Sequence, residues 1–153
     1  MKRLGVLLSG GKDSVFSAFL ASSCANIVCG ITISSKNTES YMFHTPSINM
    51  VGVQAELMNI PLIIQETQGE KELELEDLRT ALLRAKEEHS IEGIVTGAVA
   101  SQYQASRIER LCHELDLLCY NPLWQVNQME LLEDLLRFAF KALLVGIFAY
   151  PFT

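Results

Sequence analysis

The sequence from residue 4 to residue 14 decides the fold, and it reads Leu4-Gly5-Val6-Leu7-Leu8-Ser9-Gly10-Gly11-Lys12-Asp13-Ser14. Its apolar first half predicts a buried strand, and the two adjacent glycines end that strand. Residues 13–21 then carry apolar side chains at helical spacing, which predicts a helix directly after the turn. Because phosphate groups bind in glycine turns between a buried strand and a helix, we expect a phosphate-binding loop here.

The side chains of the loop Ser9–Ser14 support this prediction. Its two glycines lack a Cβ atom, so the main chain can approach an anion closely. Lys12 can neutralise phosphate charge, and the two serines offer hydroxyl donors. Asp13 would repel phosphate, so we expect it either to cap the helix or to hold Mg²⁺.

Two better-known phosphate loops do not match the sequence. The Walker pattern would need glycine where Val6 stands and serine or threonine where Asp13 stands, and the G-x-G-x-x-G pattern is absent. A bare glycine turn that only tightens a strand–helix junction is the simpler alternative. The surrounding serine, lysine and aspartate side chains favour the phosphate interpretation over that alternative.

The remaining sequence alternates strand-like and helix-like segments and contains no repeat or linker. After Leu4–Leu8, the expected strands are Ile27–Ile33, Pro61–Ile64, Gly93–Thr96, Leu117–Tyr120 and Ala142–Phe148. After the helix Asp13–Ala21, the expected helices are Thr45–Asn59, Leu73–Glu88, Ser101–Leu115 and Gln128–Phe140. We therefore predict one α/β domain over residues 1–153, with a doubly wound, mainly parallel sheet of five or six strands and helices on both faces. Such sheets bind ligands beyond the carboxyl ends of their strands, so the loops after strands one, two and four are the places to search.

Composition limits the classes of partner. The net charge is −6 and no run of lysine or arginine occurs, which disfavours nucleic acid as a partner. The four cysteines form no C-x-x-C pair, which favours reduced, mostly buried thiols in a cytoplasmic protein. The longest apolar stretch, Ala142–Phe152, is about half of the ~20 residues that a membrane span needs, so we expect no membrane partner.

Other candidate residues lie in the loops after strands two, three and four. Gly97 and Ala98 either flank the nucleotide or allow close packing. Glu39, Tyr41 and His44 share one loop and could contact a substrate, although His44 alone is more simply a polar residue next to a helix. The acidic run between Glu66 and Asp77 indicates a solvated helix face, with a Mg²⁺ role for Glu70 as the alternative. Ser101 and Gln104 fit a capping box, which would explain them without any catalytic role.

The hexapeptide from Ser9 to Ser14 resembles the signature of the N-type ATP pyrophosphatases, which split ATP between the α and β phosphates. Three further segments, residues 37–44, 93–107 and 122–124, together with Gly69–Glu72, resemble the diphthine–ammonia ligase family of that superfamily. The resemblance extends from Lys2 to Gly146.

The resemblance implies an activity and a set of site residues. A member of this family uses ATP and Mg²⁺ to adenylate the carboxylate of diphthine, a modified histidine on elongation factor two, and ammonium then displaces AMP. It implies that Ser9–Ser14, Gly97 and Ala98 bind the nucleotide, with Lys12, Asp13 and Arg107 catalytic and Asp13 the metal ligand. It places Glu39, Tyr41, His44, Ser101, Tyr103 and Gln104 at the substrate.

The sequence departs from the family pattern at its end, where Ile147–Thr153 does not resemble the usual C-terminal continuation. Three alternatives to the full ligase therefore stay open. The chain is an ATP-binding module without complete catalysis, a ligase for another substrate, or a subunit of a homo-oligomer whose apolar last strand is covered by another chain.

Overall fold

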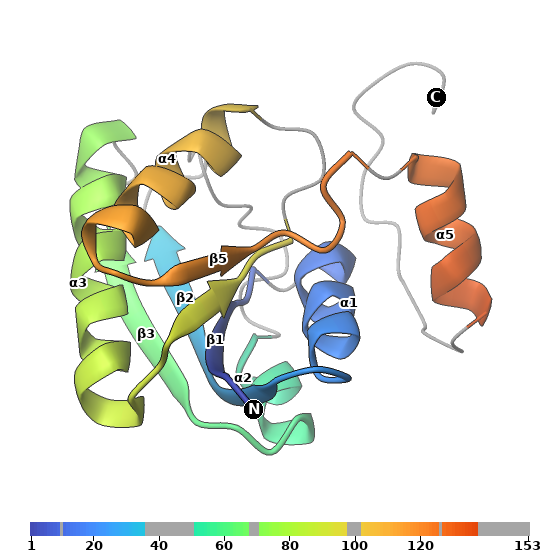
Figure 1. The fold of residues 1–153 in the computed structure, drawn as a ribbon, viewed down its shortest axis with the longest axis horizontal. Coiled ribbons are helices and arrows are strands. Elements are labelled where there is room, and N and C mark those ends of the chain that lie inside the picture. Colours follow the sequence, from blue (N-terminus) through green and yellow to red (C-terminus); the bar gives the residue numbers. More distant parts are fainter. Residues whose placement is uncertain (10, 36–50, 68–70, 98–101, 126, 138–153) are drawn as a thin grey trace.

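The computed structural model describes residues 1–9, 11–35, 51–67, 71–97, 102–125 and 127–137 (Figure 1). Its strands are β1 (Arg3–Leu7), β2 (Asn26–Ser35), β3 (Leu62–Thr67), β4 (Gly93–Val95) and β5 (Leu118–Tyr120). Its helices are α1 (Lys12–Ala21), α2 (Val51–Leu57), α3 (Lys71–His89), α4 (Gln102–Glu114) and α5 (Gln128–Arg137). Within these residues, strands and helices alternate as the sequence predicts.

The sheet is parallel throughout and has the strand order β3-β2-β1-β4-β5. The chain builds outward from β1 to β3, then crosses back and adds β4 on the other side of β1. This reversal makes the β1–β4 junction the switch point of a doubly wound sheet, where the chain leaves the two strands toward helices on opposite faces, α1 after β1 and α4 after β4. The predicted fold class is therefore confirmed.

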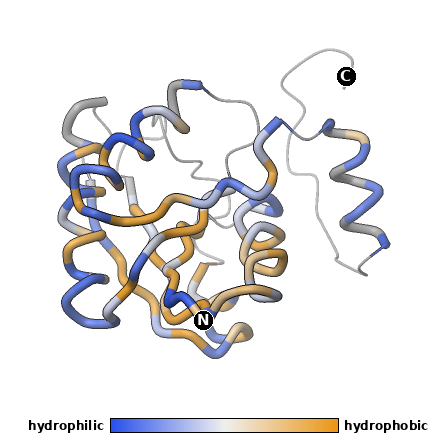
Figure 2. Tube along the Cα trace, in the orientation of Figure 1, coloured by the Kyte–Doolittle hydropathy of each residue, from blue (hydrophilic) through white to orange (hydrophobic). Residues whose placement is uncertain are grey.

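Helices cover both faces of the sheet, and each face has its own apolar core. Leu4 and Val6 of β1, and Leu8 directly after it, face α1 and α2. Leu7 points to the opposite face, which packs against α3 and α4, because successive side chains of a strand alternate. Figure 2 shows the hydrophobic residues concentrated along the strands and the inner sides of these helices, while α5 lies beyond α1, away from the sheet.

The helix ends follow from local backbone chemistry. Asn59, Ser90 and Asp116 adopt left-handed backbone angles just after α2, α3 and α4. Two of these turns close with hydrogen bonds that span five residues, from Ile60 N to the Ala55 carbonyl (3.0 Å) and from Leu117 N to the Cys112 carbonyl (2.8 Å). Such bonds satisfy carbonyl groups that a helix end would otherwise leave without a partner.

Most of the observed strand and helix boundaries lie within two residues of the predicted ones, and the clearest difference is at the end of β3. β3 runs to Thr67 instead of Ile64, because it pairs with β2 as far as the Ser35–Thr67 register. Of the helix predicted over 45–59, the structure describes the part from Val51 onward, and the strand predicted over 142–148 lies outside the described residues.

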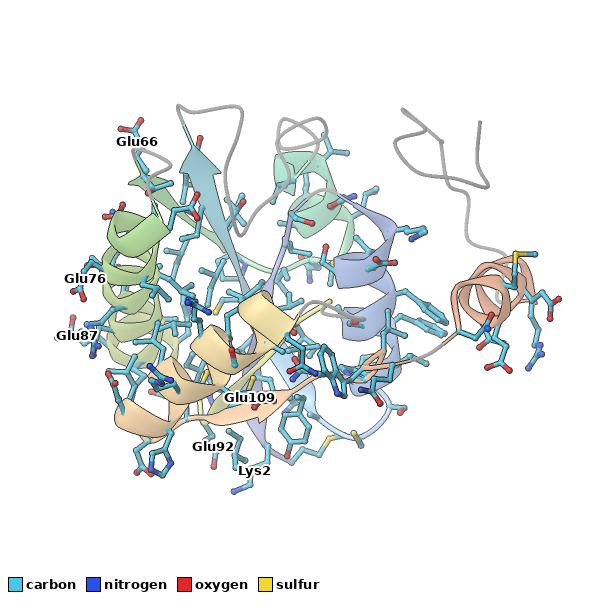
Figure 3. The ribbon with its side chains drawn as sticks, turned by 90° about the horizontal axis from the view of Figure 1, so that it is seen from above. Lys2, Glu66, Glu76, Glu87, Glu92 and Glu109 are labelled. Atoms are coloured by element: carbon cyan, nitrogen blue, oxygen red, sulfur yellow. The ribbon has the colours of Figure 1, made fainter. Side chains whose placement is uncertain are left out.

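The acidic run before and within α3 is not uniformly solvated, so that interpretation was wrong for one residue. Figure 3 shows Glu66 and Glu76 pointing away from the protein, as expected. Glu74, in the first part of α3, is fully buried. The structure thus places a carboxyl group inside the protein, where the sequence pattern predicted only an exposed face.

The four cysteines are free thiols in different surroundings. Cys29 and Cys112 are buried, Cys119 is half-buried and Cys24 is exposed. Burial in β2 raises the pKa of the Cys29 thiol to about 11. The hydrogen bond with Cys119, and then burial, raise the pKa of the Cys112 thiol, whereas that same bond lowers the pKa of Cys119.

These surroundings predict an order of alkylation. With iodoacetamide at about pH 8, Cys24 should react first, while Cys29 should stay unmodified because its thiol is both inaccessible and protonated. Peptide mass spectrometry of native and denatured protein measures this order. Equal labelling of Cys24 and Cys29 in the native protein would contradict the described packing of β2.

Within the described part of the chain, no helix combines the length and the hydrophobicity that crossing a lipid bilayer requires.

Candidate nucleotide site

The loop that follows β1 is closed by its own serines. The Ser14 hydroxyl accepts a hydrogen bond from the Ser9 N–H (3.3 Å) and donates one to the Gly11 carbonyl (3.3 Å). The Ser9 hydroxyl in turn accepts from the Gly11 N–H (3.4 Å). Ser14 is buried, so its hydroxyl fixes the turn from inside. Direct donation from either serine to a phosphate stays a prediction.

Helix α1 begins at this loop with its free N–H groups uncovered by a capping side chain. Gly11 is the N-cap residue and has an extended backbone (φ −86°, ψ 171°). The interpretation of Asp13 as the cap was wrong, because Asp13 already lies inside α1. The first N–H groups of a helix have no partner within the helix, and together with the helix dipole they favour an anion.

The charged pair of the loop is Lys12 and Asp13. Lys12 Nζ lies 2.7 Å from Asp13 Oδ1, and both side chains are about one third exposed, at 33% and 32%. The ammonium group therefore sits at the helix N-terminus, within reach of solvent. The carboxylate beside it is the kind of hard oxygen ligand that Mg²⁺ binds, and Mg²⁺ commonly needs only one or two carboxylates when phosphates supply the rest.

Gly97, which follows β4, packs directly against the first turn of α1. A Cβ atom added to Gly97 would lie 2.7 Å from the Ser14 nitrogen and 2.8 Å from the Asp13 carbonyl carbon. Close packing therefore accounts for this glycine. Because it packs against the loop's own residues, Gly97 also flanks the predicted phosphate site, while its contact with a nucleotide stays a prediction.

The other candidate residues are only partly described. Arg107 lies on α4, half-buried, and α4 also includes the backbones of Tyr103 and Gln104, whose side chains are not described. The remaining candidates lie outside the described residues, and they are Gly10, Glu39, Tyr41, His44, Glu70, Ala98 and Ser101. The roles of all these residues stay predictions.

A polar cluster next to Gly97 was missed by the sequence reasoning. The Thr96 hydroxyl donates to Asn121 Oδ1, and Asn121 Nδ2 donates to Glu109 Oε1 (3.2 Å). Thr96 and Asn121 each directly follow a strand, β4 and β5, so both stand at the carboxyl edge of the sheet. That shared position was the available signal, since carboxyl ends of parallel strands meet at one edge.

Two surface hollows lie away from the phosphate loop. One, of about 410 Å³, is bounded by the end of α2 and the start of β3. The other, of about 260 Å³, lies between the end of α1 and the segment Tyr120–Pro122. Among the described residues no group of three or more histidine, cysteine or acidic side chains is placed to hold a metal ion.

The fold and the loop define the class of the protein. The parallel sheet has helices on both faces, and a glycine turn lies at the start of the helix beside its switch point. These features define a doubly wound α/β domain, a class whose members bind nucleotides at the switch point. The sequence model of a family described as the diphthamide synthase N-terminal domain matches residues 1–118. The chain belongs to that family.

Curated relatives are named diphthine–ammonia ligase. The protein from Bos taurus is 29% identical over 166 residues, which cover 96% of this chain and 62% of the relative. The protein from Mus musculus is 30% identical with the same coverage, and the one from Schizosaccharomyces pombe is 29% identical over 100% of this chain and 28% of the relative. The chain thus spans less than two thirds of the length of these relatives.

Among solved structures, a predicted subunit of tRNA methyltransferase from Methanocaldococcus jannaschii resembles this chain, and the match covers 87% of this chain and 73% of that subunit. The TM-score is 0.47 and the sequence identity is 17%.

Proposed function

We propose that this chain is the ATP-binding, AMP-forming domain of a diphthine–ammonia ligase. The observation that carries the proposal is the loop at the start of α1, where Lys12 and Asp13 form a partly exposed pair in a first turn that no side chain caps. The family and the names of the curated relatives support the reaction class and the substrate.

In the proposed reaction, the carboxylate of diphthine on elongation factor two attacks the α-phosphorus of ATP. An acyl–adenylate bond forms as the bond to pyrophosphate breaks. Ammonia, formed when ammonium gives up a proton, then attacks the acyl carbon, and AMP leaves with the bonding electrons. The products are the amide of diphthamide, AMP and pyrophosphate.

The described residues suit the first of these steps. Lys12 and the N–H groups of α1 would hold the β and γ phosphates and stabilise the charge that grows as pyrophosphate departs. Asp13 would hold Mg²⁺, which neutralises phosphate charge when bound. Arg107 on α4 is the further cation that we propose for the phosphates.

The reaction is tested with elongation factor two that carries unamidated diphthine, together with ATP, Mg²⁺ and ammonium. We expect AMP and pyrophosphate in equal amounts, and the mass change of a carboxylate converted to an amide on the factor. Formation of ADP would contradict the proposal. Omitting ammonium should stop amide formation, which separates ligation from simple ATP hydrolysis.

The same experiment distinguishes the alternative of an ATP-binding module. Calorimetry that shows ATP binding, with no pyrophosphate release when the diphthine substrate is present, would favour the module. Pyrophosphate release with another carboxylate substrate, but not with diphthine, would favour a ligase of different specificity.

A further inference from the structure

One amide side chain, that of Asn121, joins two elements that border the switch point. Its Oδ1 accepts a hydrogen bond from the Thr96 hydroxyl just after β4, and its Nδ2 donates one to Glu109 on α4 over 3.2 Å. A main-chain bond from Thr96 N to the Tyr120 carbonyl (2.9 Å) runs beside them. We name Thr96, Glu109 and Asn121 the Asn121 cluster.

The cluster is held in a fixed geometry. Thr96 is buried, with 3% of its surface exposed, so its hydroxyl depends on partners inside the protein. Asn121 begins a turn in which the Trp124 N–H donates a hydrogen bond to the Asn121 carbonyl (3.1 Å). Pro122 is the second residue of that turn. Leu123, at 2% exposed, anchors the turn. Figure 3 shows Glu109 where α4 passes over β5.

Thr96 is linked to the phosphate loop through Gly97, the next residue in the chain. Gly97 follows Thr96, and the site of its absent Cβ is 2.7 Å from the Ser14 nitrogen and 3.0 Å from the Ser14 Cα. With no space left between the two backbones, a shift of Thr96 must move the first turn of α1 or open a gap beside it. On the other side, Glu109 is two residues from Arg107 on the same helix.

We infer that Asn121 is a positioning residue of the nucleotide site, setting the first turn of α1 and the helix that carries Arg107 relative to each other. Asn121 acts on the ligand through Gly97 and α4, and it need not touch the nucleotide. The inference rests on the proposed ATP site. It adds a residue that neither the loop sequence nor the family resemblance assigns.

The test reverses the polarity of one hydrogen bond. In Asn121→Asp, the new carboxylate can still accept from Thr96 but faces the Glu109 carboxylate. In Asn121→Asp combined with Glu109→Gln, the new amide donates to the new carboxylate, so the cluster closes again. The affinity for an ATP analogue with a non-hydrolysable α,β bridge is measured by calorimetry with Mg²⁺, and thermal unfolding is measured on the same samples.

We expect Asn121→Ala and Asn121→Asp to weaken binding of the analogue about tenfold, the equivalent of one lost hydrogen bond to the ligand. The double variant should recover to within about threefold of the unchanged protein. Glu114→Gln is the matched control, since Glu114 lies on the same helix but pairs with Arg79 of α3 at 2.5 Å. Its affinity for the analogue should not change.

Two results would overturn the inference. If Asn121→Ala folds and binds the analogue within about twofold of the unchanged protein, the cluster is only structural. If the double variant has the same unfolding temperature as the unchanged protein but binds the analogue as weakly as Asn121→Asp does, positioning through this cluster is wrong. A different result, failure of the unchanged protein to bind the analogue, would overturn the proposed ATP site together with this inference. Failure of the inference alone is therefore distinguished from failure of the proposed function.

Discussion

Replacing Gly97 by alanine should both destabilise the protein and weaken ATP binding. The added Cβ would lie 2.7 Å from the Ser14 nitrogen, 2.8 Å from the Asp13 carbonyl carbon and 3.0 Å from the Ser14 Cα. All three are main-chain atoms, so no side chain can turn away, and the first turn of α1 has to move. Overpacking of this kind costs about 1–3 kcal/mol.

The variant should lose ATP affinity as well as stability. The Ser14 N–H belongs to the first turn of α1, whose donors have no partner within the helix and are available to an anion. A methyl group against that nitrogen displaces or covers a donor at the centre of the proposed site. We therefore expect ATP affinity to fall at least about tenfold, or about 1.4 kcal/mol, in protein that still folds.

Gly52→Ala is the matched control for this prediction. Gly52 lies in α2, and a Cβ atom there would meet nothing within 4 Å. Alanine should stabilise that helix by about 0.5–1 kcal/mol, because glycine loses more backbone entropy on folding. Thermal unfolding and ATP calorimetry of both variants decide the matter. Unchanged values for Gly97→Ala would show that α1 and the end of β4 are not in contact.

The sequence alone predicts most of this fold, because its strongest signals are local. The apolar run Leu4–Leu8, the glycines after it and the helical spacing of residues 13–21 lie within one short segment. The direction of each crossover then follows from the right-handedness of parallel connections. The strand order around β1 does not follow from that rule, because several doubly wound strand orders use right-handed crossovers, so the order comes from the structure.

The parts that the sequence does not predict depend on which distant residues meet. The hydroxyl of Thr96 and the amide of Asn121 are 25 positions apart, and their hydrogen bond exists only because β4 and β5 pair in one register. Glu74 is buried although Glu72, Glu76 and Asp77 lie within three positions of it along the sequence, since the packing of α3 on the sheet decides exposure. Gly97 was predicted either to flank the nucleotide or to allow close packing, and the close packing can be seen only when α1 is placed against the end of β4.

The second large effect is expected from Lys12→Met, which removes the positive charge of the phosphate loop but keeps an unbranched apolar chain. A hydrogen bond to a charged group contributes about 1.5–3 kcal/mol, so the affinity for ATP should fall about 10- to 150-fold. Stability should change little, because the Lys12–Asp13 pair is about one third exposed and such pairs contribute about 0.2–1 kcal/mol. Calorimetry with ATP and Mg²⁺ measures the affinity, and thermal unfolding measures the stability.

Lys2→Met separates the role of Lys12 from the general effect of losing one positive charge. Lys2 precedes β1, pairs with Glu92 over 3.5 Å, and lies beside that residue in Figure 3, near the amino end of the strand instead of its carboxyl end. Both variants change the net charge equally, so long-range attraction of ATP should weaken equally in both. An affinity that falls only in Lys12→Met therefore reports a contact at the loop. Equal losses in the two variants would instead mean that Lys12 acts through net charge alone, and the loop would lose the cation on which the proposed site depends.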